Sequence, residues 1–270
     1  MEKITHCYVC EDSMEGIFTA IYDAWASGYG HANNRIQVSD ERDYELFCDY
    51  ILVTPEEEKS RKVIRTIKKT MGNEAYRYIY YMAISNEKEK ADAIYRFMIL
   101  GLHMGPSVLN HLSHDAVRPI MKTYKRVSME GHHYRGFVRF QGLSNHILCS
   151  KIRPDNNLLT LLMPHFSDRL PNENFMIVDE GRGIAGVHPS KKEWFLVLTD
   201  QMTSPMLSDY SEQEQIMQQV WGTFVDSISI KERENYQLQR NMCPLRYREF
   251  MPEFQRQTKE KKGREYEVTE

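Results

Sequence analysis

Two short segments hold the side chains best suited to acid–base chemistry. Residues 164–169 read Pro-His-Phe-Ser-Asp-Arg and residues 179–183 read Asp-Glu-Gly-Arg-Gly. If these segments converge in the fold, His165, Asp179 and Arg182 could transfer protons and stabilise charge, which makes them candidate catalytic residues. The alternative is structural. Cations at a helix C-terminus offset the helix dipole, and a glycine-rich turn often carries a surface salt bridge.

The stretch 118–139 is the most basic part of the chain, with six Lys or Arg residues and a single acid, Glu130. We predict a strand over 134–141, because polar and apolar residues alternate there. A strand would put Arg135 and Arg139 on one face, where they could bind phosphates. The alternative is a solvated sheet face beside an ordinary helix. From this stretch the candidate nucleic-acid-binding residues are Arg118, Lys122, Arg135 and Arg139.

The Cys7-x-x-Cys10 motif could form half of a zinc site or a redox pair. A zinc site needs a second pair of ligands, and Cys149 and Cys243 are isolated in the sequence. A redox motif usually starts at a helix N-terminus, whereas this pair lies on a predicted strand. We therefore expect ordinary thiols, with no metal and no cofactor in this chain. The odd count of five cysteines also argues against a disulfide framework.

Composition narrows the class of protein. The 270 residues are 41% hydrophobic and carry a net charge of -3, which is typical of a globular protein. Charge is uneven, because residues 1–60 hold 13 acids against four bases. No apolar run is long enough for a transmembrane helix, and the N-terminus does not resemble a signal peptide, so we expect a cytoplasmic protein with no membrane contact. Phosphate-loop, Rossmann, HExxH, kinase and GxSxG signatures are absent from the sequence.

Hydrophobic periodicity predicts an α+β fold with three parts. The first is a helical N-terminal part that follows a strand over 6–10, with one more possible strand within 28–50. The second has the order ββαβββ and forms a mainly antiparallel sheet, because the links between its strands are short. The third is a set of C-terminal helices. The expected elements of the last two parts are strands 134–141, 146–152, 175–179, 184–188 and 194–198 and helices 156–170 and 211–229.

These parts predict one domain over 1–258. Its helical half is expected over about 12–131, its sheet half over about 134–200 and its C-terminal helices over about 211–253. The segment 259–270 is rich in charged residues, and we expect it to be a frayed tail.

Several motifs together resemble one family in their order and spacing. They are Tyr8-Val-Cys-Glu-Asp12-Ser13-Met-Glu15-Gly16, Tyr134-Arg-Gly-Phe-Val-Arg-Phe140, Ile152-Arg-Pro154-Asp155, Pro164-His165-Phe166-x-x-Arg169, Asp179-x-x-Arg182-Gly183, Arg233-x-Asn235-x-x-Leu238-Gln239 and Pro244-x-Arg246-Tyr247. This pattern, over roughly 5–253, resembles the DUF4130 family of bacterial proteins associated with DNA repair. The chain departs from the family pattern at Cys10-Glu11 and at Cys243.

The resemblance implies a role in nucleic-acid repair beside a radical SAM protein. In other members of the family the domain is fused to a uracil-DNA-glycosylase-like domain. The iron–sulfur cluster and S-adenosylmethionine would then belong to the partner protein. The positions that match the family motifs become candidate site residues, namely Arg135, Arg139, His165, Arg169, Asp179, Arg182, Arg233, Asn235, Gln239, Arg246 and Tyr247.

Three functions remain open at this point. The leading one is a DNA-repair accessory protein that binds DNA, damaged or single-stranded, and acts with the radical SAM partner. The second is a nucleic-acid-processing enzyme in its own right that uses His165, Asp179 and Arg182. The third is a protein-interaction adaptor without DNA binding, in which the acidic residues 1–60 dock a basic partner surface.

Overall fold

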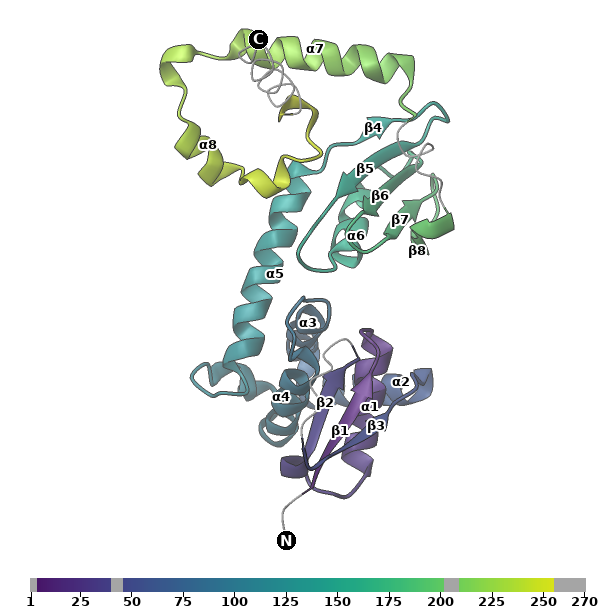
Figure 1. Cartoon of the computed structure of the whole chain (residues 1–270), viewed down its shortest axis with the longest axis vertical. Coiled ribbons are helices and arrows are strands. Elements are labelled where there is room, and N and C mark those ends of the chain that lie inside the picture. The colour runs from purple at the N-terminus through teal and green to yellow at the C-terminus, as the bar shows by residue number, and fades with distance from the viewer. Residues whose placement is uncertain (1–3, 40–45, 202–208, 255–270) are drawn as a thin grey trace. The chain divides into compact units, whose positions relative to one another are not determined.

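The chain divides into two compact units, Met1–Met129 and Glu130–Glu270. A computed structural model describes residues 4–39, 46–201 and 209–254 (Figure 1). The boundary falls within helix α5 (Arg118–Phe137) and close to the expected junction of the helical and sheet halves. That the units form a single domain over 1–258 stays a prediction, and the expected tail at 259–270 lies outside the described residues.

The first unit contains a three-stranded parallel sheet in the order β2-β1-β3. Its strands are β1 (Thr5–Cys10), β2 (Asn34–Val38) and β3 (Cys48–Leu52). The sequence predicts β1 and leaves room for one strand within 28–50, where the structure has β2 and the first part of β3. Helix α1 (Met14–Ala26) connects β1 to β2, as a parallel pair requires.

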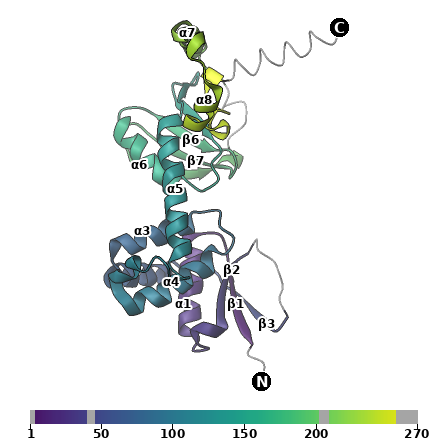
Figure 2. The ribbon, with the colours of Figure 1, turned by 90° about the vertical axis from the view of Figure 1, so that its left-hand side faces the viewer.

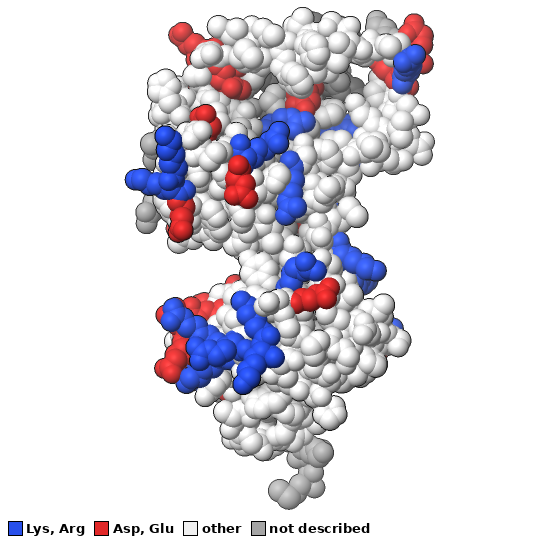
Figure 3. Space-filling model, turned by 180° about the vertical axis from the view of Figure 1, so that it is seen from behind, with Lys and Arg blue, Asp and Glu red and all other residues white. Residues whose placement is uncertain are grey.

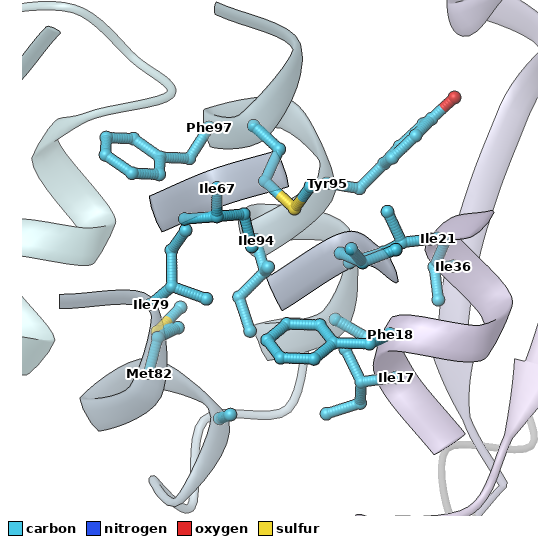
Figure 4. Close-up of a cluster of buried hydrophobic side chains, with 14 of the residues drawn as sticks. Ile17, Phe18, Ile21, Ile36, Ile67, Ile79, Met82, Ile94, Tyr95 and Phe97 are labelled. Carbon is cyan, nitrogen blue, oxygen red and sulfur yellow. The ribbon is translucent and has the colours of Figure 1, made fainter. Parts of the chain in front are cut away.

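Helices make up most of the core of the first unit. They are α2 (Glu57–Thr70), α3 (Gly72–Ala83) and α4 (Lys90–Met104), and all three lie within the predicted helical half. Each contributes apolar side chains at a helical spacing to one cluster, which Figure 4 shows in close-up. The fully buried members include Ile17, Phe18, Ile67, Ile79 and Ile94.

Helix α5 corrects the predicted strand over 134–141. The helix continues to Phe137, and β4 is reduced to Gln141–Gly142. The buried side chains Val127, Glu130 and Tyr134 recur every three or four residues, which keeps one face of α5 against the protein. The strand prediction was therefore wrong. The alternating residues continue a helical stripe, and Arg135 and Arg139 share no strand face.

The second unit confirms the predicted order ββαβββ. After β4 come β5 (Leu148–Ile152), α6 (Leu159–Arg169), β6 (Phe175–Asp179), β7 (Ile184–His188) and β8 (Phe195–Leu198). The sheet order is β4-β5-β6-β7-β8, and every pair except β5–β6 is antiparallel. Helix α6 makes the β5–β6 crossover and lies on β6 and β7 (Figure 2).

The remaining described chain of the second unit is helical, as predicted. It holds α7 (Glu212–Ile228) and the short helix α8 (Tyr236–Met242). Short 3-10 helices occur at His31–Asn33, Gly105–Asn110, Thr199–Gln201, Lys231–Arg233 and Leu245–Tyr247. No helix within 4–39, 46–201 and 209–254 is both long and apolar enough to cross a membrane.

Candidate nucleic-acid interface

A buried acid on α5 holds the loop between β5 and α6. Glu130 is only 3% exposed, so its carboxylate needs hydrogen-bond donors. It accepts from the backbone N–H of Asp155 (2.7 Å) and of Asn156 (3.3 Å), and from the Asn156 side-chain amide. The only acid of the basic stretch therefore has a structural role.

A second buried acid fixes the same loop through an arginine. Asp179 ends β6, is fully buried and accepts hydrogen bonds from the Arg182 guanidinium (3.0 Å) and from the backbone N–H of Gly181 (3.1 Å). Burial raises the pKa of the Asp179 carboxyl, and the neighbouring Arg182 opposes that rise. Arg182 also donates to the carbonyl oxygens of Pro154 (2.9 Å) and Asp155 (2.6 Å).

A second arginine reaches the loop from the C-terminal segment. Arg246 donates to the Asp155 carboxylate (2.6 Å) and to the Tyr247 hydroxyl (2.8 Å), and that hydroxyl lies 3.2 Å from Nδ1 of His133. Burial raises the pKa of Tyr247, so it stays a neutral phenol. We call Glu130, Asp155, Asn156, Asp179, Arg182, Arg246 and Tyr247 the loop clasp.

The three candidate catalytic residues do not all meet. Asp179 and Arg182 contact each other beside the end of β5, because Ile152 pairs with Asp179 in the sheet. Helix α6 starts at this end and runs back along the sheet, so His165, in its second half, lies toward the opposite end. The structure therefore places an acid and an arginine together and His165 elsewhere.

His165 instead lies near two arginines, Arg135 and Arg169, whose charges act on it. Helices α5 and α6 approach closely at Gly131 and Leu161, and one turn further along each helix stand Arg135 and His165. Burial lowers the pKa of His165, and the charges of Arg135 and Arg169 lower it further. Asp168 opposes this lowering as the smallest cause, and the net lowering favours the neutral imidazole.

The two arginines beside His165 are available for a ligand. Both Arg135 and Arg169 are exposed, and within the described residues neither forms an ion pair with an acid. We call Arg135, His165 and Arg169 the basic surface. Because their charge is uncompensated by a bonded carboxylate, they can bind an anion such as a phosphate.

The other predicted cations and polar residues have protein partners or lie apart. Arg139 pairs with Glu253 (2.9 Å), and Arg118 and Lys122 are exposed in the first unit, where Arg118 pairs with Asp115. Figure 3 shows one face of the molecule, on which basic and acidic side chains lie side by side. Because acids pair with several of these arginines, their number alone does not show a positive surface that is free to bind a ligand.

The C-terminal candidates are mainly structural. Asn235 caps α8, since its side chain accepts from the Leu238 N–H (2.9 Å). Gln239 accepts hydrogen bonds from Arg248 through its backbone carbonyl (2.9 Å) and its side chain. Arg233 is exposed.

The cysteine pair of β1 is buried. Cys7 donates to the Gln37 side chain (3.3 Å), and Cys10 donates to the Gln37 carbonyl oxygen (3.6 Å). Burial raises the pKa of Cys10 to about 12, with Asp12 as a smaller cause, so the thiol stays protonated. Among the described residues no group of three or more His, Cys, Asp or Glu side chains is placed to hold a metal ion.

Sequence reasoning missed the residues that the loop clasp adds. Glu130 could have been recognised, because it is the single acid of a basic stretch and lies on the buried face of a helix. A buried acid at such a position must have hydrogen-bond partners. Asn156 of the loop clasp gave no comparable signal, and neither did Glu253, which lies outside the clasp and pairs with Arg139, since the partners of both come from distant parts of the chain.

A comparison with models of protein families identifies the family of this chain. No curated protein sequence matches the chain. The sequence model of one family, described as a domain of unknown function, DUF4130, matches residues 88–253. The match starts later than the resemblance expected from residue 5, and it contains both the loop clasp and the basic surface. Because it covers more than half of the 270 residues, the chain belongs to the DUF4130 family.

Proposed function

We propose that this protein binds nucleic acid through its basic surface. The observation that carries the proposal is the pair Arg135 and Arg169, which are exposed near His165 and form no ion pair with an acid among the described residues. Guanidinium groups bind phosphate oxygens through two hydrogen bonds at once. Two such groups on adjacent helices can hold successive phosphates of one strand.

The biological role that we propose is that of a DNA-repair accessory protein. The family resemblance supports it, because it implies an association with repair and with a radical SAM partner. In this scheme the partner holds the iron–sulfur cluster and S-adenosylmethionine, and this chain holds the DNA. Catalysis by His165, Asp179 and Arg182 has less support, since Asp179 and Arg182 bond to each other and to the loop.

The test is the salt dependence of binding. We would measure fluorescence polarisation of labelled single-stranded, duplex and abasic-site DNA at about 50 and 200 mM salt. In the variant R135Q/R169Q the slope of log affinity against log salt should fall by about 1.4 on single strands, from about 0.7 for each lost phosphate contact. The matched control is K192Q/R240Q, which removes two exposed cations elsewhere in the second unit.

The outcomes separate the candidate functions. An unchanged slope in R135Q/R169Q, with wild-type binding intact, would show that other residues hold the DNA. No binding of any probe at micromolar wild-type protein would contradict the proposal and favour the adaptor.

A further inference from the structure

The solvent side of helix α2 carries a run of cations. Residues 61–70 hold five Lys or Arg residues and no acid, although residues 1–60 are strongly acidic. The buried side chains Ser60, Val63 and Ile67 lie on the opposite side of the helix. Figure 3 shows basic side chains gathered over α2, with acidic ones beside them. All five cations are exposed, namely Arg61, Lys62, Arg65, Lys68 and Lys69.

These cations differ in their partners. Arg61 and Lys62 each pair with a glutamate four residues earlier in the same helix. One turn further on, Arg65, Lys68 and Lys69 form no ion pair with an acid within 4–39, 46–201 and 209–254. We call these three residues the α2 cations. Their charge is available to an anionic ligand, as that of the basic surface is.

A structural role explains only part of this pattern. Lys68 and Lys69 lie in the last turn of α2, where positive charge offsets the helix dipole. Arg65 lies before that turn and has no such role. Because Arg65 and Lys69 are four residues apart, they share one face of the helix and stand about 6 Å apart along its axis. The pair can therefore contact two anionic groups in a row.

A hollow of about 520 Å³ lies between α1, α2 and α4, within the first unit. Its volume is in the usual range of ligand sites, and its wall is mainly apolar. Trp25 is 41% exposed, so its ring is within reach of a ligand that enters the hollow. The lining residues are Ile21, Tyr22, Trp25, Ala26, Lys62, Val63, Thr66, Thr70, Met98 and Leu102.

The helical repeat of α2 places the α2 cations at the edge of the hollow. Lys62 and Thr66 of this helix line the hollow. Residues three apart are neighbours on a helix surface, so Arg65 adjoins Lys62, and Lys69 adjoins Thr66. A ligand in the hollow therefore has a row of cations beside it, all on the same helix.

This arrangement favours single-stranded nucleic acid as the ligand. Sites for single strands combine cations along the backbone with aromatic rings that receive unstacked bases. A small anion needs one cation, whereas the α2 cations extend over more than one turn. A helix that binds a membrane surface presents large apolar side chains beside its cations, but the exposed residues of α2 are all polar or charged.

We propose that the hollow and the α2 cations form a second binding site for single-stranded nucleic acid. Phosphates of the strand bind Arg65 and Lys69, and one unstacked base packs against Trp25 in the hollow. This inference rests on the proposed function and adds a site in the first unit and a preference for single strands. Bases of a duplex stay stacked, so a duplex reaches the cations but not the hollow.

The first experiment measures the salt slope of binding for a labelled single strand of about 60 nucleotides, long enough to contact both units. In R65Q/K69Q the slope of log affinity against log salt should fall by about 1.4, from about 0.7 for each lost phosphate contact. The matched control is R61Q/K62Q, which removes two paired cations from the same helix and should leave the slope nearly unchanged. Both variants replace exposed residues, so their urea midpoints should stay near that of the wild type.

The second experiment tests the hollow separately from the charges. Trp25→Leu keeps an apolar side chain but removes the ring, so it should weaken single-strand binding about tenfold, as for the loss of one stacked base, with an unchanged salt slope. Its affinity for duplex should equal that of the wild type. Trp25→Phe keeps a ring and should retain most of the affinity, which separates stacking from any loss of stability. Tyr29→Ala is the matched control, because Tyr29 is 50% exposed and does not line the hollow.

The outcomes distinguish the two proposals. A slope in R65Q/K69Q that falls no further than in R61Q/K62Q overturns the second site, while a reduced slope in R135Q/R169Q would still support the proposed function. Single-strand affinity that is unchanged in Trp25→Leu, or lost equally for single strand and duplex, also overturns the site as proposed. A reduced slope in R65Q/K69Q alone would support the second site and contradict the basic surface. No binding of any strand overturns both proposals.

Discussion

The second unit contains two sets of arginines that look alike in the sequence and differ in the structure. Arg182 and Arg246 of the loop clasp each bond to a carboxylate and to at least one other oxygen of the protein. Arg135 and Arg169 of the basic surface have no acidic partner among the described residues and face solvent. The first set holds the β5–α6 loop in place, and the second set is free for a ligand.

The two sets of arginines contribute to different processes, the first to folding and the second to ligand binding. A guanidinium that neutralises a buried carboxylate stabilises the fold, because the acid would otherwise be buried without a partner. A solvated guanidinium adds little to folding but keeps its full capacity to bind phosphate. Substitutions in the two sets should therefore change different measurements.

The largest effect on stability is expected for Arg182→Gln. It leaves the fully buried Asp179 carboxylate without its counter-charge, which should cost about 3–5 kcal/mol of unfolding free energy at pH 7. Urea denaturation measures this loss. The double variant D179N/R182Q removes the unpaired charge and should recover part of it, and no recovery would mean that the lost bonds to the loop carbonyls dominate.

Arg182→Gln should also widen the pH range over which the stability of the protein depends on Asp179. Burial raises the pKa of Asp179, so the folded protein holds this proton at a pH where the unfolded chain has released it. Stability therefore falls as pH rises from the usual pKa of an aspartate to the raised value. Without Arg182 the pKa of Asp179 rises further and this window widens. A pH-independent loss in Arg182→Gln would contradict this view of the pair.

A smaller effect is expected for Glu130→Gln. The amide keeps one acceptor oxygen for the loop but places an N–H₂ group against the donors of Asn156, which should cost about 2 kcal/mol. The matched control is Glu212→Gln, on the exposed side of α7, which should be nearly neutral. Equal denaturation midpoints for the two variants would remove Glu130 from the loop clasp.

Arg246→Gln should cost still less. The Arg246 and Asp155 side chains are both more than half exposed, and such ion pairs contribute about 0–1 kcal/mol. Arg118→Gln, which breaks an exposed pair in the first unit, is a fitting control. A loss in Arg246→Gln far above that of the control would show that the bond to the Tyr247 hydroxyl, rather than the ion pair, holds the segment.

The smallest effect is a change in the titration of His165. Burial is the main cause of its low pKa, and Arg135 and Arg169 add to it. R135Q/R169Q should therefore raise the pKa of His165 toward its usual value, which an NMR titration of the imidazole measures. In the wild type, affinity for DNA should increase as pH falls through this pKa, because the imidazolium adds a third positive charge. An unshifted titration would place the arginines too far from His165.

Much of the fold follows from local patterns in the sequence. Strands β6 and β7 coincide with the predicted 175–179 and 184–188, because short apolar runs end at glycine or proline there. The end of α5 was missed because its aromatic residues alternate with polar ones, whereas the buried stripe through Glu130 and Tyr134 depends on tertiary contacts.

The candidate site was less predictable than the fold. Motifs in the sequence single out Arg135, Arg169 and His165, but they do not distinguish these residues from Arg139 and Arg246. That distinction depends on Glu253 and Asp155, which are distant in the chain and contact those arginines only in the folded protein. Residue type alone therefore predicts that an arginine is charged. Whether that arginine is free to bind a ligand depends on the acid that it contacts in the folded protein.

The most direct measurement compares two double variants, R135Q/R169Q and R153Q/R246Q, by DNA salt slope and by urea midpoint. Arg153 pairs with Glu180 and Glu249, as Arg246 pairs with Asp155, so the second variant removes two paired arginines. We expect R135Q/R169Q to lower the salt slope by about 1.4 with an unchanged midpoint, and R153Q/R246Q to lower the midpoint with an unchanged slope. Equal losses of slope in the two variants would contradict the division between free and structural arginines.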